Sequence, residues 1–146
     1  MRRLVIMRRL LLTIGALSAV ACGGDSSTGP GDMSAVGSFQ LQTVNGSALP
    51  YTAVSLPSPV FKLELLSDLV VIRSDGSYTQ TFSTRQTQGT TVTTDTQAVS
   101  GTWTQSNGTV TFTPTGGSPS TLARGIVAGD VLTVTVTGAV FVYRRQ

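Results

Sequence analysis

The side chains that most often carry enzyme chemistry are nearly absent from this chain. It contains no histidine and a single cysteine, Cys22. Histidine is the general base of Ser/His/Asp and Cys/His catalysis, and histidine and cysteine are the usual ligands of zinc and copper. No glycine-rich segment lies between a strand and a helix, where it could hold phosphate groups. We therefore expect a protein that is not an enzyme and has no metal site and no cofactor.

Carboxylates are the remaining groups that could act in pairs, as they do in glycoside hydrolysis. Five of the seven acidic residues fall at an outward strand position, in turn signals or in a polar N-terminal stretch: Glu64, Asp75, Asp130, Asp25 and Asp32. A catalytic pair would have to come from the other two, Asp68 and Asp95. We predict instead that both are solvated residues near strand ends.

Residues 1–21 have the three-part pattern of a bacterial secretory signal peptide. A basic segment, 1–9, is followed by the apolar run 10–21, which ends in small residues just before Cys22. The alternative is a transmembrane helix, but that needs about 20 apolar residues and the run is shorter. Residues 22–36 are rich in Gly, Ser and Asp and predict a flexible tether. The domain proper is expected at 37–146.

The residues around the cysteine, Leu17-Ser18-Ala19-Val20-Ala21-Cys22, resemble the lipobox of bacterial lipoproteins. The resemblance implies that Cys22 becomes the N-terminus after cleavage and carries acyl chains on its sulfur and nitrogen. Two or three acyl chains anchor a protein stably to a membrane. The implied location is the bacterial cell envelope, and Gly23 after the cysteine resembles the signal for sorting to the outer membrane. The alternative for Cys22 is a free thiol with no partner for a disulfide.

The basic charge of the whole chain belongs mostly to the signal segment. The formal net charge is +3, but Arg2, Arg3, Arg8 and Arg9 all precede the apolar run. From Cys22 onward, six basic residues stand against seven acidic ones. Proteins that bind nucleic acid carry a clustered excess of Lys and Arg, so we expect no nucleic-acid partner.

The rest of the chain has the pattern of antiparallel β-structure. Thr, Val, Ser and Gln alternate with period 2, no stretch has helical periodicity, and turn signals such as Asn107-Gly108 recur throughout. Strands are predicted near residues 38–44, 61–66, 69–74, 77–86, 90–98, 101–105, 109–113, 121–127, 130–136 and 139–144. The segment Leu49–Pro59 contains three prolines and is predicted to be a crossing loop, with a short edge strand near Thr52–Val54.

Two-residue turns determine which residues face each other in a hairpin. A turn at Asn107-Gly108 pairs Trp103 with Phe112 and predicts that both rings lie in the core. A turn at Thr137-Gly138 predicts three more pairs: Val136 with Ala139, Val134 with Phe141, and Leu132 with Tyr143.

The third hairpin leaves its register open. A turn at Asp75-Gly76 puts Tyr78 and Phe82 on the side of Leu69 and Val71. The intervening Val70 and Ile72 are apolar as well, so that the pattern does not decide between the two faces.

Eight to ten strands of this kind predict an all-β fold, an up-and-down meander that closes into a small barrel and leaves no exposed edge. A two-sheet β-sandwich is the alternative.

Several segments resemble the small lipocalin-like lipoproteins of bacteria: Gly37-Ser38-Phe39, Val44-Asn45-Gly46, Leu49-Pro50, Ser74-Asp75-Gly76-Ser77-Tyr78, Ser100-Gly101-Thr102-Trp103 and Phe141-Val142-Tyr143-Arg144-Arg145. In lipocalins a Trp on the first strand closes the barrel floor, and an Arg on the last strand packs across its ring. The resemblance implies that Phe39 stands in place of that Trp, and Arg145 in place of that Arg.

Two functions fit such a barrel, because eight-stranded barrels either fill their interior or hold one small ligand. One is a lipid-anchored module that binds a small apolar or amphipathic ligand. The other is a structural or interaction protein with a filled barrel that contacts or inhibits an envelope protein. The candidate lining residues are the same in both cases: Phe39, Tyr78, Phe82, Trp103, Phe112, Phe141 and Tyr143.

Overall fold

The computed structural model describes residues 34–115 and 122–146. The predicted signal peptide, Cys22 and the tether as far as residue 33 lie outside the described residues. Within them the chain forms ten β-strands: β1 (Gly37–Val44), β2 (Ser47–Ala48), β3 (Tyr51–Pro57), β4 (Val60–Ile72), β5 (Ser77–Gln88), β6 (Thr91–Ser106), β7 (Thr109–Pro114), β8 (Arg124–Ala128), β9 (Val131–Val136) and β10 (Ala139–Arg145).

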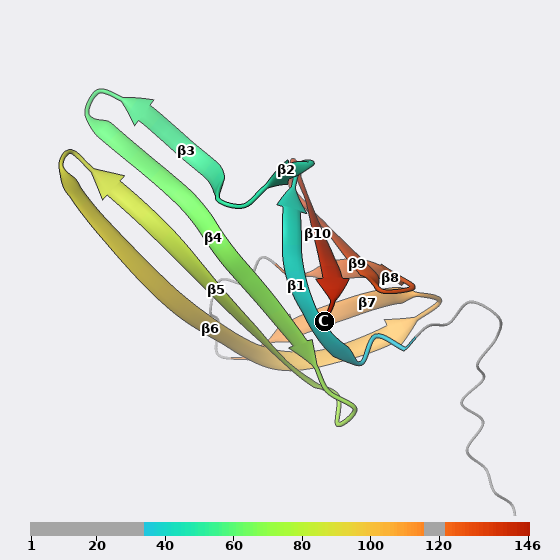
Figure 1. Ribbon diagram of the computed structural model, residues 1–146. Helices are drawn as coiled ribbons and strands as arrows, with labels where there is room; N and C mark the ends of the chain where they lie inside the picture. The colour runs from blue at the N-terminus through green and yellow to red at the C-terminus, as the bar shows by residue number, and fades with distance from the viewer. Residues whose placement is uncertain (1–33, 116–121) are drawn as a thin grey trace, which may run out of the picture.

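The ten strands form one antiparallel sheet that closes on itself (Figure 1). From β4 to β10 each strand pairs with the next along the chain. The barrel closes because β1 pairs with β10 on one side and with the last residues of β4 on the other, where Gly37 lies opposite Ile72. The predicted all-β meander that closes into a small barrel is confirmed, and eight strands, β1 and β4 to β10, form the barrel. The two-sheet sandwich does not form.

Three strands differ from the predicted elements. The predicted strands 61–66 and 69–74 are one strand, β4, whose register shifts by one residue at Leu66. The predicted strands 90–98 and 101–105 are likewise one strand, β6. The segment predicted to be a crossing loop contains a full strand, β3, which pairs with the first half of β4.

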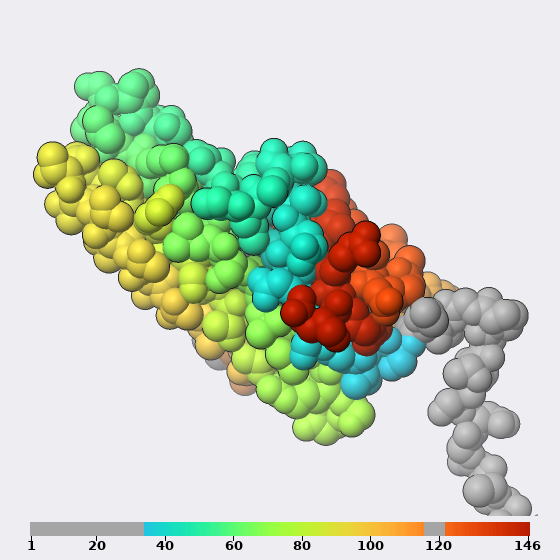
Figure 2. All heavy atoms as spheres, in the orientation of Figure 1, coloured from blue at the N-terminus to red at the C-terminus, as the bar shows by residue number. Residues whose placement is uncertain are grey.

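The long strands project beyond the barrel and form what we call the sheet extension. It consists of β3 together with residues 60–66 of β4, 82–88 of β5 and 91–97 of β6, which pair in that order. Figures 1 and 2 show it as the green and yellow end of an elongated molecule. The opposite end of the barrel, where β1 begins and β10 ends, we call the closed end.

Two of the three hairpins have the predicted register. Trp103 lies opposite Phe112, and the three pairs predicted around Thr137-Gly138 are all present. At Asn107-Gly108 both residues have positive φ, 50° and 73°, as a tight hairpin turn requires.

The third hairpin, whose register the sequence left open, does not put Tyr78 and Phe82 on the side of Leu69 and Val71. The loop is four residues long, Arg73–Gly76, with the Arg73 amide donating to the Ser77 carbonyl oxygen at 2.9 Å. Tyr78 therefore lies opposite Ile72, and the alternation along β5 brings Phe82 to the face of Val70 and Asp68.

The core lies between the closed end and the middle of the barrel. The aromatic residues Phe39, Tyr78, Phe112 and Tyr143 are fully or almost fully buried there among Val, Leu and Ile side chains. The rings of Tyr78 and Phe112 meet edge to face, with centroids 5.0 Å apart. Each large apolar side chain buried in this way contributes roughly 1.5–3 kcal/mol to the free energy of folding. Together these side chains fill the barrel interior toward the closed end.

Candidate functional site

A pocket of about 340 Å³ opens where the barrel meets the sheet extension. Its walls come from the open end of the barrel, from β3, from the first half of β4 and from the middle of β5. Nearly all of its lining is aliphatic or aromatic: Val44, Tyr51, Ala53, Leu63, Leu65, Phe82, Thr84, Ala139 and Phe141. A pocket of this size and character falls in the usual range of small-molecule sites, about 300–1,000 Å³.

The sequence places these residues together through strand alternation. Leu63 and Leu65 lie two apart on β4, and they pair with Gln86 and Thr84 on β5. Side chains two apart in a strand share a face. We call the face that carries Leu63 and Leu65 the inner face, since it continues into the barrel interior.

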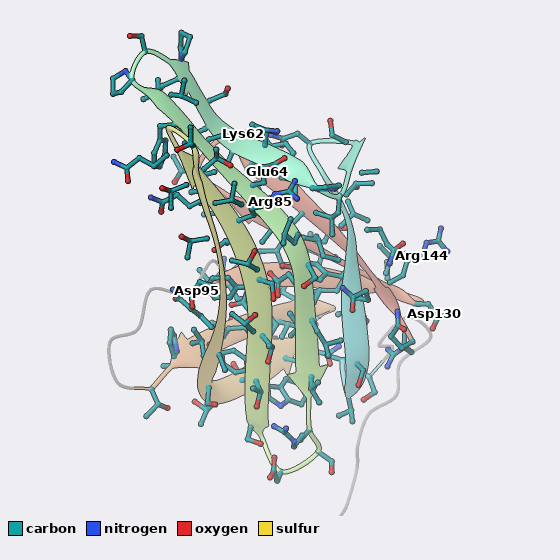
Figure 3. All side chains as sticks on the ribbon, turned by 60° about the vertical axis from the view of Figure 1, so that its left-hand side comes forward. Lys62, Glu64, Arg85, Asp95, Asp130 and Arg144 are labelled. Carbon is teal, nitrogen blue, oxygen red and sulfur yellow. The ribbon has the colours of Figure 1, made fainter. Side chains whose placement is uncertain are left out.

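The outer face of the same strands carries a group of three charges. Glu64 accepts from Lys62 Nζ at 2.7 Å and from Arg85 Nε at 2.8 Å. Figure 3 shows the three side chains together on the extension. The hydrogen bonds from Arg85 and Lys62 lower the pKa of Glu64 to about 2. The predicted outward orientation of Glu64 is confirmed, but its neighbours cover it and leave only 5% of the residue exposed.

Asp68 is buried on the inner face directly opposite Phe82 of the pocket. Its Oδ2 accepts from Gln80 Nε2 at 2.7 Å and from the Tyr143 hydroxyl at 2.9 Å. Its Oδ1 is buried and has no hydrogen-bond partner among the described residues. Burial raises the pKa of Asp68 to about 6, although both hydrogen bonds oppose the shift. Burial and the charge of Asp68 also raise the pKa of Tyr143 well above its usual range.

The expectation that Asp68 is solvated at a strand end was therefore wrong: the residue is 2% exposed. The two predicted strands that flank it are one continuous strand, so that no strand end occurs there. Asp95 is exposed as expected, but it lies within β6, opposite Thr84 of the pocket. Gln97 Nε2 donates to Asp95 Oδ2 at 2.8 Å.

The seven aromatic residues predicted to line the barrel fall into three groups. Phe82 and Phe141 line the pocket. The four core aromatics, Phe39, Tyr78, Phe112 and Tyr143, fill the barrel below it. Trp103 is half-buried, with its indole Nε1 donating to the Arg73 carbonyl oxygen at 2.8 Å, so that it packs against the edge of the core instead of inside it.

Phe39 and Arg145 lie opposite each other on β1 and β10. They meet at the closed end of the barrel, far from the pocket.

Most of the other pocket residues were missed by the sequence reasoning. Tyr51 and Ala53 belong to the segment predicted to be a crossing loop, and Val44 and Ala139 border hairpin turns. One signal was present, because Leu63 and Leu65 alternate with the charged Lys62 and Glu64. This pattern indicates an apolar inner face that continues beyond the barrel.

No group of three or more acidic or cysteine side chains suited to a metal ion occurs among residues 34–115 and 122–146. In the same part of the chain, no helix is long and apolar enough to span a membrane. In comparisons with known proteins, no family model, curated protein or solved structure matches this chain.

Proposed function

We propose that this chain is a lipocalin-like, lipid-anchored protein of the bacterial envelope whose barrel binds a small apolar or amphipathic molecule without catalysis. The observation that carries the proposal is the apolar pocket at the open end of the barrel. Its volume of about 340 Å³ suits one small ligand, and the filled core beneath gives it a floor.

The aromatic side chains divide the barrel in a way that supports binding at one end only. Phe82 and Phe141 face the pocket, whereas Tyr143, two residues after Phe141 on β10, is fully buried in the core. A barrel that served only as a rigid scaffold would gain stability by filling the open end as well. Leaving apolar side chains around an open pocket costs stability and is typical of a binding site.

The proposed anchor suits this placement of the pocket. The described chain begins at the closed end, where the Ser34 carbonyl oxygen accepts from Arg145 and the Ala35 amide donates to Gln105. An acylated Cys22 would thus be joined to the closed end, leaving the pocket at the end of the barrel away from that attachment. Gly23 after the cysteine, which resembles the outer-membrane sorting signal, supports the outer membrane as the site of anchoring.

One observation favours the alternative function, binding of an envelope protein. Val54 and Leu56 of β3 are 40% and 51% exposed, on a strand with one unpaired edge. Exposed apolar side chains on such an edge are also found where a partner docks. The pocket favours the small ligand, because its residues converge on one cavity.

The test is native mass spectrometry of the full chain purified from its own envelope in a non-ionic detergent. We expect an additional bound mass on the wild type. Leu63→Gln, which puts an amide into the pocket wall, should weaken binding about fivefold, the effect of about 1 kcal/mol of lost apolar burial, and so lower the occupied fraction.

Val60→Gln is the matched control, because Val60 lies on the outer face of the same strand. It should leave the occupancy unchanged. A wild type without any bound small molecule that copurifies instead with a protein would favour the alternative. Equal occupancy in Leu63→Gln and wild type would place the ligand outside this pocket.

A further inference from the structure

The inner face of the sheet extension is apolar on one side and polar on the other. On β3 and β4 the inward side chains beyond the barrel are Tyr51, Val54, Leu56, Phe61, Leu63 and Leu65. On the neighbouring strands β5 and β6 the side chains on this same face are Thr84, Gln86, Gln88, Thr91, Thr93 and Asp95. Both sets continue from the pocket toward the tip of the extension. The part of the inner face on β3 and β4, which we call the apolar wall, is therefore hydrocarbon, and the part on β5 and β6, which we call the polar wall, offers hydroxyls, amides and one carboxylate.

The apolar wall is long enough to follow an extended chain. Leu65 and Phe61 are four residues apart on β4, which corresponds to about 13 Å at the rise of a β-strand. Leu63 lies between them on the same face and lines the pocket. An extended alkyl chain can thus lie along β3 and β4 with one end in the pocket.

The charges of the extension are sorted between its two faces. Both of its basic residues, Lys62 and Arg85, lie on the outer face, where they pair with Glu64. The charged residues of the inner face and of its continuation into the barrel next to the pocket are both acidic: Asp95 lies opposite Thr84 of the pocket, and Asp68 lies opposite Phe82. In Figure 3, Asp95 lies apart from the cluster formed by Lys62, Glu64 and Arg85.

From this arrangement we propose that the ligand is an elongated amphiphile whose polar group donates hydrogen bonds and carries no negative charge. The inference rests on the proposed function and names the class of its ligand. The alkyl chain lies against β3 and β4, and the polar group faces the Gln and Thr side chains of β5 and β6. A carboxylate or phosphate there would meet Asp95 with no basic side chain on the same face.

The polar wall fits both an uncharged hydroxyl-bearing group and a protonated amine. Gln and Thr side chains both accept hydrogen bonds from such groups, and the Asp95 carboxylate accepts only. Asp95 Oδ2 accepts from Gln97, which leaves Oδ1 available opposite Thr84 of the pocket. The shared requirement is a donor, and the experiment separates the uncharged group from the cation.

Three amphiphiles with the same dodecyl chain test the inference: dodecylamine, 1-O-dodecylglycerol and dodecanoate. Each is titrated into the full chain in a non-ionic detergent at pH 7.5 and low salt, and the bound fraction is read by native mass spectrometry. We expect the amine and the glycerol ether to bind about tenfold more tightly than dodecanoate, since an uncompensated like charge is repelled.

Asp95→Asn isolates the electrostatic contribution to amphiphile binding, since Asp95 is exposed and its replacement does not disturb the core. It should weaken the binding of dodecylamine about threefold, strengthen the binding of dodecanoate and leave the binding of the glycerol ether unchanged. The small size of these effects is in keeping with the modest strength of exposed charge interactions. The control is Asp75→Asn, in the Arg73–Gly76 loop at the closed end, which should change none of the three.

The two proposals fail in different ways. If all three compounds bind equally, or dodecanoate binds best, the inferred ligand class is wrong while the pocket still binds apolar chains. If none of the three binds, the proposed binding function falls, and the inferred class with it.

Discussion

The guanidinium of Arg145 lies over the ring of Phe39, with Cζ 4.6 Å from the ring centroid. The same group donates to the backbone oxygens of Val36 and Ser34, and its Nε lies 3.2 Å from Asp130 Oδ1. Gly37 makes this possible, because residues with a Cβ rarely adopt its φ of +149° and a Cβ there would meet the Arg145 guanidinium. One side chain thus joins both ends of the described chain at the closed end of the barrel.

Replacing Arg145 by Lys should therefore lower the free energy of unfolding although the charge is kept. The ammonium cannot reproduce the planar arrangement of donors, and we expect a loss of about 1–3 kcal/mol from two hydrogen bonds and the cation–π contact. Urea unfolding followed by tryptophan fluorescence measures it. Arg144→Lys, at the exposed neighbouring position, should change stability by less than about 0.5 kcal/mol; equal effects would mean that the Arg145 contacts contribute little.

Gly101 should not tolerate even a methyl group. A Cβ there would lie 2.7 Å from Tyr78 Cε1 and 2.9 Å from Pro114 Cα. The Tyr78 ring is held by Phe112, so that the backbone has to shift, and we expect Gly101→Ala to cost about 1–3 kcal/mol, as overpacked cores do. The measurement is the midpoint of thermal unfolding. A midpoint equal to that of the wild type would show that β6 and β7 separate easily at this position.

The facing pair Trp103 and Phe112 should respond unequally to substitution. Phe112 is 4% exposed and packs against Tyr78, so Phe112→Ala should cost about 3–5 kcal/mol. Trp103→Phe keeps most of the half-buried ring and loses the hydrogen bond to the Arg73 carbonyl, for about 1 kcal/mol. Thr104→Ala on the exposed face should cost less than that. Denaturant unfolding of all three ranks them, and a Phe112→Ala variant as stable as Thr104→Ala would contradict the burial of Phe112.

The fold could be predicted where short-range geometry decides it. Asn107-Gly108 and Thr137-Gly138 are two-residue turns, so that each hairpin has only one register and the facing pairs follow. The Arg73–Gly76 loop could not be predicted in the same way. There the Asp75 carboxylate accepts from the Ser77 amide and hydroxyl, and three residues instead of two separate the paired Arg73 and Ser77. This shift of the register by one residue turns Tyr78 to the other face.

The pocket was harder to predict because it depends on long-range pairing. Whether Leu63 and Leu65 face a cavity depends on the extra residue in β4 at Leu66 and on β3 pairing beside it. Asp68 was misplaced for the same reason. Its burial is offset by Gln80 and Tyr143, and Tyr143 is 75 residues away in the chain, so that no local pattern reports the contact.

Anchoring is predicted to depend on Cys22 alone. Cys22→Ser should leave an unprocessed precursor and abolish incorporation of a radiolabelled fatty acid, since serine has no thiol to acylate. Ser18→Ala, in the same segment, should leave processing unchanged. Gel mobility and label incorporation in the envelope fraction measure both variants. Normal labelling of Cys22→Ser would show that the lipobox resemblance is misleading.

The buried Asp68 predicts an unusual dependence of stability on pH. Its pKa is raised from 3.8 to about 6 in the folded chain, so that between these values the native state holds a proton that the unfolded state has lost. Unfolding free energy falls as pH rises wherever the native state binds more protons. The contribution from Asp68 is therefore fully present below about pH 4 and is lost as the pH rises through about 6. A shift of about two pKa units corresponds to about 3 kcal/mol.

The variant Asp68→Asn separates the contribution of Asp68 to the pH dependence of stability from the contributions of the other carboxylates. Glu64 has a lowered pKa, so that its contribution is lost in acid, in the opposite sense, and it cancels when wild type and Asp68→Asn are compared at each pH. Relative to wild type, Asp68→Asn should gain about 3 kcal/mol between pH 4 and pH 7, measured by urea unfolding. Tyr143→Phe removes a hydrogen bond that favours the charged carboxylate, so that in this variant stability should fall over a range that extends to higher pH. A difference in unfolding free energy between wild type and Asp68→Asn that stays constant from pH 4 to pH 7 would mean that folding does not raise the pKa of Asp68.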